Sequence, residues 1–186
     1  MKNIAIFASG SGSNFQAIVD AVESKGIQAN IGLMVCDKPG AYVIERAEKH
    51  SIPSFVFAAR DYASKQEYER EILKELRNRG IELIILAGYM RLIGETLLEA
   101  FSKKIVNIHP SLLPQFPGKD AIGQALEAGV QETGVTIHYV DEGMDTGPII
   151  AQQAISVAAD ETKESLQKKI HALEHVLYPK TIKTII

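Results

Sequence analysis

Residues 4–14 read IAIFASGSGSN, an unbroken apolar run that passes directly into a loop of glycine and serine. An apolar run of this kind is typical of a parallel strand that is buried on both faces. Beyond the loop, apolar residues recur at the spacing of one helical face, at Phe15, Ile18, Val19 and Val22. The segment therefore predicts a buried strand that leads through a tight turn into an amphipathic helix.

The same alternation of strand and helix continues along the chain. Further strands are expected at residues 31–36, 54–57, 83–87 and 105–108, with helices at 41–50, 65–79 and 95–101. Beyond them we expect an ordered irregular loop at 109–120, a helix at 121–128, strands at 135–140 and 149–157, and a helix at 162–185 that Pro179 kinks or ends. The pattern predicts one α/β domain over residues 1–186, with a doubly wound, mostly parallel sheet and antiparallel additions after residue 130.

Composition narrows the class of function. The chain has 186 residues and a formal net charge of −3, which gives no bulk attraction to nucleic acid or to an anionic membrane. Its single cysteine, Cys36, excludes an internal disulfide and lies in an apolar run, so we expect a buried core thiol. The first residues do not resemble a signal peptide, and no stretch has the length of a membrane span. We therefore expect a cytoplasmic protein.

The glycine loop after the first strand favours an anion site. Small residues let backbone N–H groups approach a phosphate at the N-terminus of a helix. The plainer interpretation is a tight turn in which Ser13 or Asn14 caps the helix, and both can hold at once. The dinucleotide fingerprint fails where Phe15 replaces its last glycine, and the Walker A pattern is also missing, so a single phosphate monoester fits better. Asp37 could still bind a ribose, which leaves a nucleotide-dependent dehydrogenase open.

A second group of polar residues follows the strand at 105–108. Asn107 and His109 are two residues apart, so both side chains point to one face, where a carboxamide and an imidazole can stabilise an oxyanion. Asp145 lies in a later glycine-rich loop, and a carboxylate near an imidazole favours the imidazolium. Alternatively, Asn107 is a strand-end cap, His109 a hydrogen-bonded structural residue and Asp145 a turn residue.

Two motifs together indicate a family. The run NIHPSLLP at 107–114, combined with DTGP at 145–148, resembles the folate-dependent formyltransferases, and the GSGSN loop at 10–14 resembles their purine-pathway branch. The resemblance covers essentially the whole chain. It implies transfer of a formyl group from 10-formyltetrahydrofolate, the co-substrate, to the amine of glycinamide ribonucleotide. It implies a phosphate- and ribonucleotide-binding N-terminal half and a folate-binding, catalytic C-terminal half, acting as a monomer or homodimer.

The resemblance also implies roles for individual positions. The catalytic trio corresponds to Asn107, His109 and Asp145. The ribonucleotide and its phosphate are assigned to Gly12, Ser13, Asn14 and Glu174. The folate is assigned to Lys65, Met90, Arg91, Leu92, Ile93, Asn107, Asp141, Glu142, Gly143 and Met144. Lys65 departs from the pattern, because some members carry an arginine there, and lysine keeps the charge but loses the bidentate fork.

Other histidines offer weaker signals. His171, Glu174 and His175 match a zinc-protease pattern, but no third ligand is marked upstream, so we expect no metal. His138 is expected to be a hydrogen-bonded strand residue near the site, and His50 to cap the last carbonyls of its helix.

Rival functions remain at this stage. A methionyl-tRNA formyltransferase would need a further domain and a basic surface for RNA. A formyltetrahydrofolate deformylase would use water in place of the amine and typically carries an extra N-terminal domain. A dehydrogenase would use the glycine loop and Asp37, and a binding module would leave Asn107, His109 and Asp145 without a use.

Overall fold

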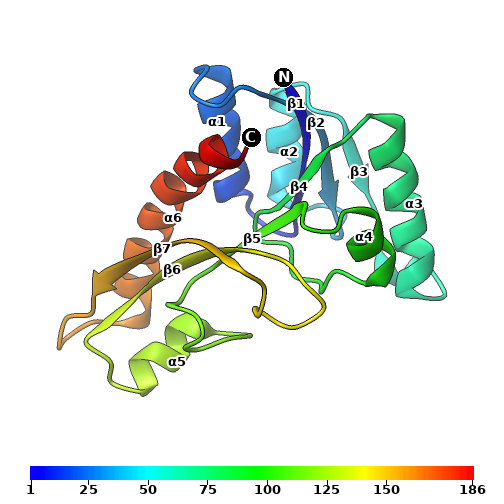
Figure 1. Ribbon diagram of the computed structural model, residues 1–186. Helices are drawn as coiled ribbons and strands as arrows, with labels where there is room; N and C mark the ends of the chain where they lie inside the picture. Colours follow the sequence, from blue (N-terminus) through cyan, green and yellow to red (C-terminus); the bar gives the residue numbers. More distant parts are fainter.

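The computed structural model describes residues 1–186 as a seven-stranded sheet with helices on both faces (Figure 1). Along the sheet the strand order is β3-β2-β1-β4-β5-β6-β7. The strands are β1 Lys2–Ala8, β2 Ala29–Cys36, β3 Ser54–Val56, β4 Leu83–Leu86, β5 Ile105–His109, β6 Glu132–Tyr139 and β7 Ile149–Ser156. The helices are α1 Ser13–Glu23, α2 Tyr42–Lys49, α3 Lys65–Asn78, α4 Glu95–Ala100, α5 Ala121–Glu127 and α6 Lys163–Ile185, with a 3₁₀ helix η1 at Ala59–Asp61.

The predicted α/β class is confirmed. Strands β1 to β5 pair in parallel, while β6 pairs antiparallel with both β5 and β7, so the antiparallel additions lie where we expected them. One prediction is wrong in part, because the last helix does not end at Pro179 but continues to Ile185. Thr181 and Ile182 are buried beyond the proline, and their packing holds that last turn in place.

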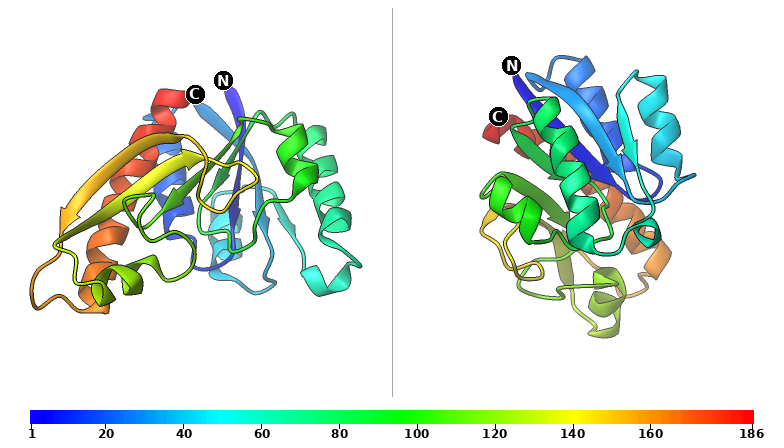
Figure 2. Two further views of the ribbon diagram at one scale, coloured as in Figure 1. Left: turned by 60° about the horizontal axis from the view of Figure 1, so that its bottom comes forward. Right: turned by 90° about the vertical axis from the view of Figure 1, so that its right-hand side faces the viewer.

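Two apolar core clusters cover the two faces of the sheet. Figures 1 and 2 show the helices that lie over these faces. Alternate residues of β1 point to opposite faces, with Ile4 and Ile6 in one core cluster and Ala5 and Phe7 in the other. Helices α1, α2 and α6 contribute buried residues to the first cluster, and α3 and α4 to the second. No helix combines the length and the apolar character that crossing a bilayer requires.

The order of the parallel strands locates the crevice. Strand β1 lies between β2 and β4, so the direction of winding reverses between β1 and β4. In open α/β sheets, ligands bind beyond the carboxyl ends of the strands at such a reversal. The loops that follow β1, β4 and β5 therefore meet at one edge of the sheet, and this edge is where a site is expected.

A tyrosine of α6 fixes the helix to this edge. Tyr178 is fully buried, and its hydroxyl lies 2.7 Å from the carbonyl oxygen of Leu86 and 3.2 Å from that of Val106. These carbonyls belong to β4 and β5, so one hydroxyl joins α6 to two neighbouring strands. Burial raises the pKa of Tyr178 well above its ordinary value, which keeps the hydroxyl a donor.

Replacing Tyr178 with phenylalanine removes this donor and leaves two buried carbonyls without it. We expect Tyr178→Phe to lower the free energy of unfolding by about 1–3 kcal/mol with the fold retained. Urea unfolding monitored by circular dichroism measures the change. The matched control is Tyr42→Phe, at an exposed ring, and equal stability of the two variants would contradict the bridging role.

Candidate active site

The predicted catalytic side chains meet at the junction of β5 and β6. His109 ends β5 and is buried, and Asp145 lies in the loop between β6 and β7. The Nδ1 atom of His109 is 3.5 Å from Oδ2 of Asp145. Asp145 has a left-handed backbone with φ of 56°, and its Oδ2 also accepts a hydrogen bond of 2.9 Å from the N–H of Gly118. The carboxylate is therefore held in place from two sides.

The second nitrogen of His109 also faces an oxygen. Its Nε2 lies 2.8 Å from the carbonyl oxygen of Phe116. A ring with both nitrogens protonated can donate to Asp145 and to Phe116 at once. The site is thus arranged to accommodate an imidazolium. Asn107, two residues earlier on the same strand, is half-buried, and its carboxamide makes no hydrogen bond to the rest of the chain, so it remains available to a ligand.

The proline-rich loop after β5 is bonded to β6. The Thr136 hydroxyl accepts from the Leu113 N–H at 3.0 Å and donates to the Ser111 carbonyl at 2.7 Å. The Ser111 hydroxyl in turn donates to the Gln115 carbonyl at 2.6 Å. These bonds fix the loop that presents the Phe116 carbonyl to His109.

The sequence placed His138 near the site but did not reveal its contact with Asp145. It bonds to its neighbour, with Nδ1 2.9 Å from the Tyr139 carbonyl oxygen, as expected of a strand residue. Its Nε2, however, lies 3.7 Å from Oδ1 of Asp145, so this carboxylate stands between two imidazoles. The cause is the register, which places His138 directly opposite Asn107. That register becomes visible only once β5 and β6 are paired.

The glycine loop packs tightly against α2. Gly12 is the N-cap of α1 with φ of 76°, and a Cβ there would lie 2.5 Å from Cγ2 of Val43. Arg46 of α2 donates from Nε to the Ser11 carbonyl at 2.7 Å. No side chain caps α1, so the interpretation in which Ser13 or Asn14 caps the helix is wrong. The amides at the start of the helix are left for an anion.

Glu174 of α6 lies beside this loop, although it is 160 residues away in sequence from Asn14. Asn14 donates from Nδ2 to Oε1 of Glu174 at 3.4 Å. Burial raises the pKa of Glu174 from its ordinary 4.5 to about 7, and the hydrogen bond from Asn14 opposes the rise. The structure therefore brings together all four residues assigned to the ribonucleotide.

The loop between β4 and α4 carries exposed apolar side chains. Met90 is 70% exposed and Leu92 56% exposed, while Ile93 is buried. Lys65 reaches this loop from α3, with Nζ donating to the Leu92 carbonyl at 2.7 Å. The folate residues expected from the first half of the chain therefore lie together on one loop and the helix beside it.

Asp37 plays a different part from the one that the dehydrogenase alternative required. Its side chain is only 1% exposed and binds Arg91, with Nε 2.8 Å from Oδ2. A carboxylate buried in this way cannot reach a ribose. The neighbouring Cys36 is the expected core thiol, and burial raises its pKa.

The loop between β6 and β7 closes the other side of the site. Asp141 organises it, since its Oδ1 accepts from the Thr146 hydroxyl at 2.7 Å and from the Gly143 N–H at 3.0 Å. Met144 is 49% exposed and borders Gly118 of the proline-rich loop, and Glu142 is exposed beside it. This loop thus adds a further apolar side chain next to Asp145.

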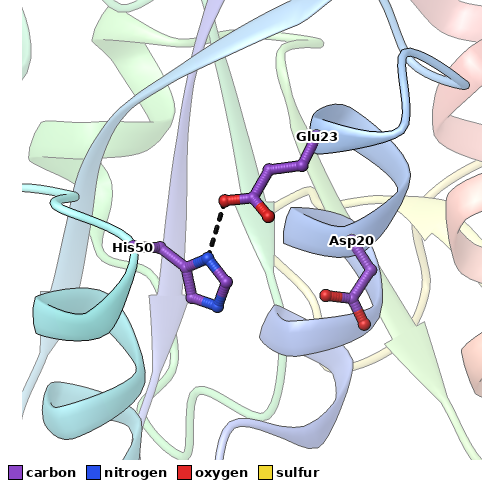
Figure 3. A group of neighbouring side chains, drawn as sticks. All are labelled: Asp20, Glu23 and His50. Carbon is purple, nitrogen blue, oxygen red and sulfur yellow. Dashed lines mark hydrogen bonds and ion pairs between the residues drawn. The ribbon is translucent and has the colours of Figure 1, made fainter.

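Possible metal-ligand side chains gather elsewhere, at Asp20, Glu23 and His50, whose donor atoms lie within 4.8 Å of one another (Figure 3). His50 Nδ1 is 2.6 Å from Oε1 of Glu23, and its Nε2 is 3.1 Å from Nε2 of Gln16. The ring thus connects the end of α2 to α1. The prediction that His50 caps the last carbonyls of its helix is wrong. His171 and His175 of α6 stack with ring centroids 6.3 Å apart, His171 exposed and His175 half-buried.

Residues 2–182 match the model of the family described as Formyl transferase. The chain belongs to the formyl transferase family. Phosphoribosylglycinamide formyltransferase of Bacillus subtilis is 57% identical over 186 residues, which cover 100% of this chain and 95% of that protein. The trifunctional purine biosynthetic protein adenosine-3 of Drosophila melanogaster is 41% identical over 187 residues, 100% of this chain but 14% of that protein.

Solved structures agree with this assignment. Glycinamide ribonucleotide transformylase 1 from Geobacillus kaustophilus superposes with a TM-score of 0.98 at 61% identity, covering 100% of this chain and 98% of that one. Phosphoribosylglycinamide formyltransferase from Bacillus halodurans gives a TM-score of 0.97 at 53% identity, covering 99% of this chain and 95% of that one. Both the formyltransferase resemblance and the fold expected from the sequence are confirmed.

The raised pKa of Glu174 gives this formyl transferase a pH-dependent stability. The folded-state pKa of about 7 lies above the ordinary 4.5, so ionisation costs stability that is intact below pH 4.5 and lost as the pH rises through 7. Glu174→Gln removes that cost. At pH 8 we expect the variant to be more stable than the parent by up to about 3 kcal/mol, and near pH 4.5 to differ little.

Thermal or urea unfolding of both proteins across this pH range measures the difference. Glu164→Gln, at an exposed position of the same helix, serves as the control and should show no such trend. A stability change of the same size at both ends of the range would mean that Glu174 does not titrate as its burial indicates.

Proposed function

We propose that this chain transfers the formyl group of 10-formyltetrahydrofolate to the amine of glycinamide ribonucleotide, giving formylglycinamide ribonucleotide and tetrahydrofolate. The observation that carries the proposal is the pairing of His109 with Asp145 at 3.5 Å beside the unpartnered carboxamide of Asn107. The acceptor is proposed from the Bacillus subtilis relative, which is 57% identical and named for this reaction.

The ribonucleotide is proposed to bind at the start of α1. Gly12, Ser13 and Asn14 offer backbone N–H groups and the positive end of the helix dipole to its phosphate. The buried Glu174 lies beside the same loop through Asn14, where an ionised carboxylate can accept hydrogen bonds from sugar hydroxyls. A local site of this kind suits a chain whose overall charge is negative.

The reduced folate is proposed to lie between the β4–α4 and β6–β7 loops. The exposed side chains of Met90, Leu92 and Met144 supply an apolar surface for a flat ring, next to the buried Ile93. Backbone groups of residues 141–144 and the carboxamide of Asn107 provide polar contacts. Arg91 supplies a cation for the carboxylates of the folate tail, and Lys65 supports the same loop.

In the reaction, the substrate amine attacks the formyl carbon. A new carbon–nitrogen bond forms, and the bond from the formyl carbon to the folate nitrogen then breaks. The oxyanion that develops in between is stabilised by the Asn107 amide and by doubly protonated His109, each worth roughly 10²–10³ in rate. Asp145 pairs with the imidazolium and orients a water that carries the proton from the amine to the leaving nitrogen. Binding both substrates side by side removes much of the entropic cost of their encounter.

We further propose that the chain acts as one domain, without a metal, in the cytoplasm, as a monomer or homodimer. Neither nucleic acid nor a membrane is a proposed partner. The net charge of −3 supports this view for nucleic acid, because non-specific binding to phosphate backbones depends on an excess of basic residues.

The substrate assignment predicts a strict dependence on the acceptor. We expect folate product to form from 10-formyltetrahydrofolate only when glycinamide ribonucleotide is present, as followed by absorbance. Release of tetrahydrofolate and formate without the ribonucleotide would instead indicate a deformylase. Absence of any reaction with both substrates present would contradict the proposal.

The catalytic assignment predicts that replacing either of two residues greatly lowers the turnover rate. His109→Ala and Asp145→Asn should each lower kcat by about 10²–10³ with both substrates saturating, because the oxyanion loses a charged donor or that donor loses its counter-charge. His50→Ala and Asp160→Asn are matched controls outside the site and should stay near the parent rate. Variants of His109 and Asp145 that keep turnover within a few-fold of the parent would show the assignment to be wrong.

A further inference from the structure

A buried carboxylate that the proposed reaction does not use lies at the carboxyl end of β2. The Asp37 side chain is 1% exposed, although the residue is charged and next to the crevice. Burial of a charge is costly unless it is paired and hydrogen-bonded. Asp37 meets this condition with both oxygens, and each partner leads to the loop between β4 and α4.

The first connection runs through Ser9 at the end of β1. The Ser9 hydroxyl donates to Oδ1 of Asp37 at 2.5 Å and accepts from the N–H of Met90 at 2.9 Å. The N–H of Ser9 also donates to the Gly88 carbonyl at 3.1 Å. A hydroxyl has one proton to donate, so its donation to Asp37 leaves the oxygen lone pairs facing Met90. Asp37 thereby sets the backbone position of Met90.

The second connection is direct. Arg91 donates from Nε to Oδ2 of Asp37 at 2.8 Å, and its side chain remains 37% exposed. Nε is engaged by Asp37 and the Tyr68 hydroxyl lies close to the guanidinium, but the side chain is partly exposed, so a ligand can still approach its terminal N–H groups. A guanidinium held in one orientation can receive a carboxylate through two parallel hydrogen bonds. Asp37 therefore orients this arginine as well as neutralising it.

The remainder of the loop is fixed from the opposite side by α3. Lys65 donates to the Leu92 carbonyl at 2.7 Å, and Glu69 accepts from the Gly94 N–H at 2.7 Å through Oε2. Burial raises the pKa of Glu69, and the Gly94 hydrogen bond opposes that rise. The loop has no regular secondary structure of its own, so these side chains determine its shape, and Asp37 controls the end nearest the crevice.

We propose that Asp37 is a positioning residue for the formyl donor. Through Ser9 it places the Met90 backbone under the flat ring, and through Arg91 it aims a guanidinium at the carboxylates of the donor's tail. This inference rests on the proposed function, since it requires residues 90–93 to bind the reduced folate. It predicts that changes at Asp37 alter the KM for the formyl donor. The KM for the ribonucleotide should stay the same, because Asp37 does not contact the residues proposed to bind it.

The test compares Asp37→Ala, Asp37→Asn and Ser9→Ala with the parent in steady-state kinetics. We expect Asp37→Ala to raise the KM for 10-formyltetrahydrofolate about tenfold or more, with kcat and the KM for glycinamide ribonucleotide within about threefold. Asp37→Asn keeps the shape of the side chain but replaces one acceptor oxygen with an NH2 donor, so it should raise the KM for the formyl donor by a smaller factor than Asp37→Ala does. Asp61→Asn, at an exposed carboxylate of η1, is the matched control.

A second donor separates the two connections. With the amide of 10-formyltetrahydropteroic acid, which carries no carboxylate, the KM ratio of Asp37→Ala to the parent should fall, because Arg91 then has no carboxylate to bind. Ser9→Ala, which acts through Met90, should raise the KM of both donors alike. If the role of Asp37 were purely structural, its replacement would change the KM values for both donors and for the ribonucleotide together.

The outcomes distinguish this inference from the proposed function. Parent turnover with both substrates and an unchanged donor KM in Asp37→Ala and Ser9→Ala would overturn the positioning role alone. No turnover by the parent would overturn the proposed function. If Asp37→Ala does not fold, Asp37→Asn and Ser9→Ala, which preserve the packing more closely, decide the question by the same donor KM.

Discussion

The pairing of β5 with β6 is the constraint on which the site depends. Up to β5 the sheet is parallel, and each strand ends at the same edge. By turning back antiparallel to β5, strand β6 aligns His138 with Asn107 and Thr136 with His109. The loop that follows β6 then delivers Asp145 to the ring of His109, while Thr136 bonds to the proline-rich loop after β5. A slip of one residue in this register would turn these side chains to the opposite face.

Buried carboxylates mark the edges of the crevice. Asp37 binds the loop after β4, Glu69 caps the start of α4, and Glu174 lies beside the glycine loop, and all three are buried. Apolar residues at these positions would avoid the free-energy cost of removing each carboxylate from water. Asp37 follows β2, while Glu69 and Glu174 lie on α3 and α6, and none of the three belongs to an apolar cluster, which is consistent with positions that serve binding at some expense of stability.

Local pattern was sufficient for some features of this protein. The first strand–loop–helix unit was identified from three local signals: the apolar run at residues 4–8, the glycine loop after it, and the spacing of Phe15, Ile18 and Val19. A strand buried on both faces is apolar throughout, whereas a helix buried on one face has apolar residues at helical spacing, so the two patterns differ. Alternation along a strand likewise placed Asn107 and His109 on one face. The motif at 107–114 identified the family, since it joins the strand, the histidine and the proline-rich loop in one stretch.

Other features were decided only by the tertiary structure, because they join residues that are distant in sequence. Asn14 meets Glu174 across 160 residues, and Arg91 meets Asp37 across 54. The sequence left Asp37 open as a ribose ligand, and only the burial of its side chain against Ser9 and Arg91 excludes that role. The cap of α1 by Gly12 depends on the approach of Val43 from another helix. Periodicity reports which face of an element is buried, whereas the identity of the neighbour is set by how the sheet winds.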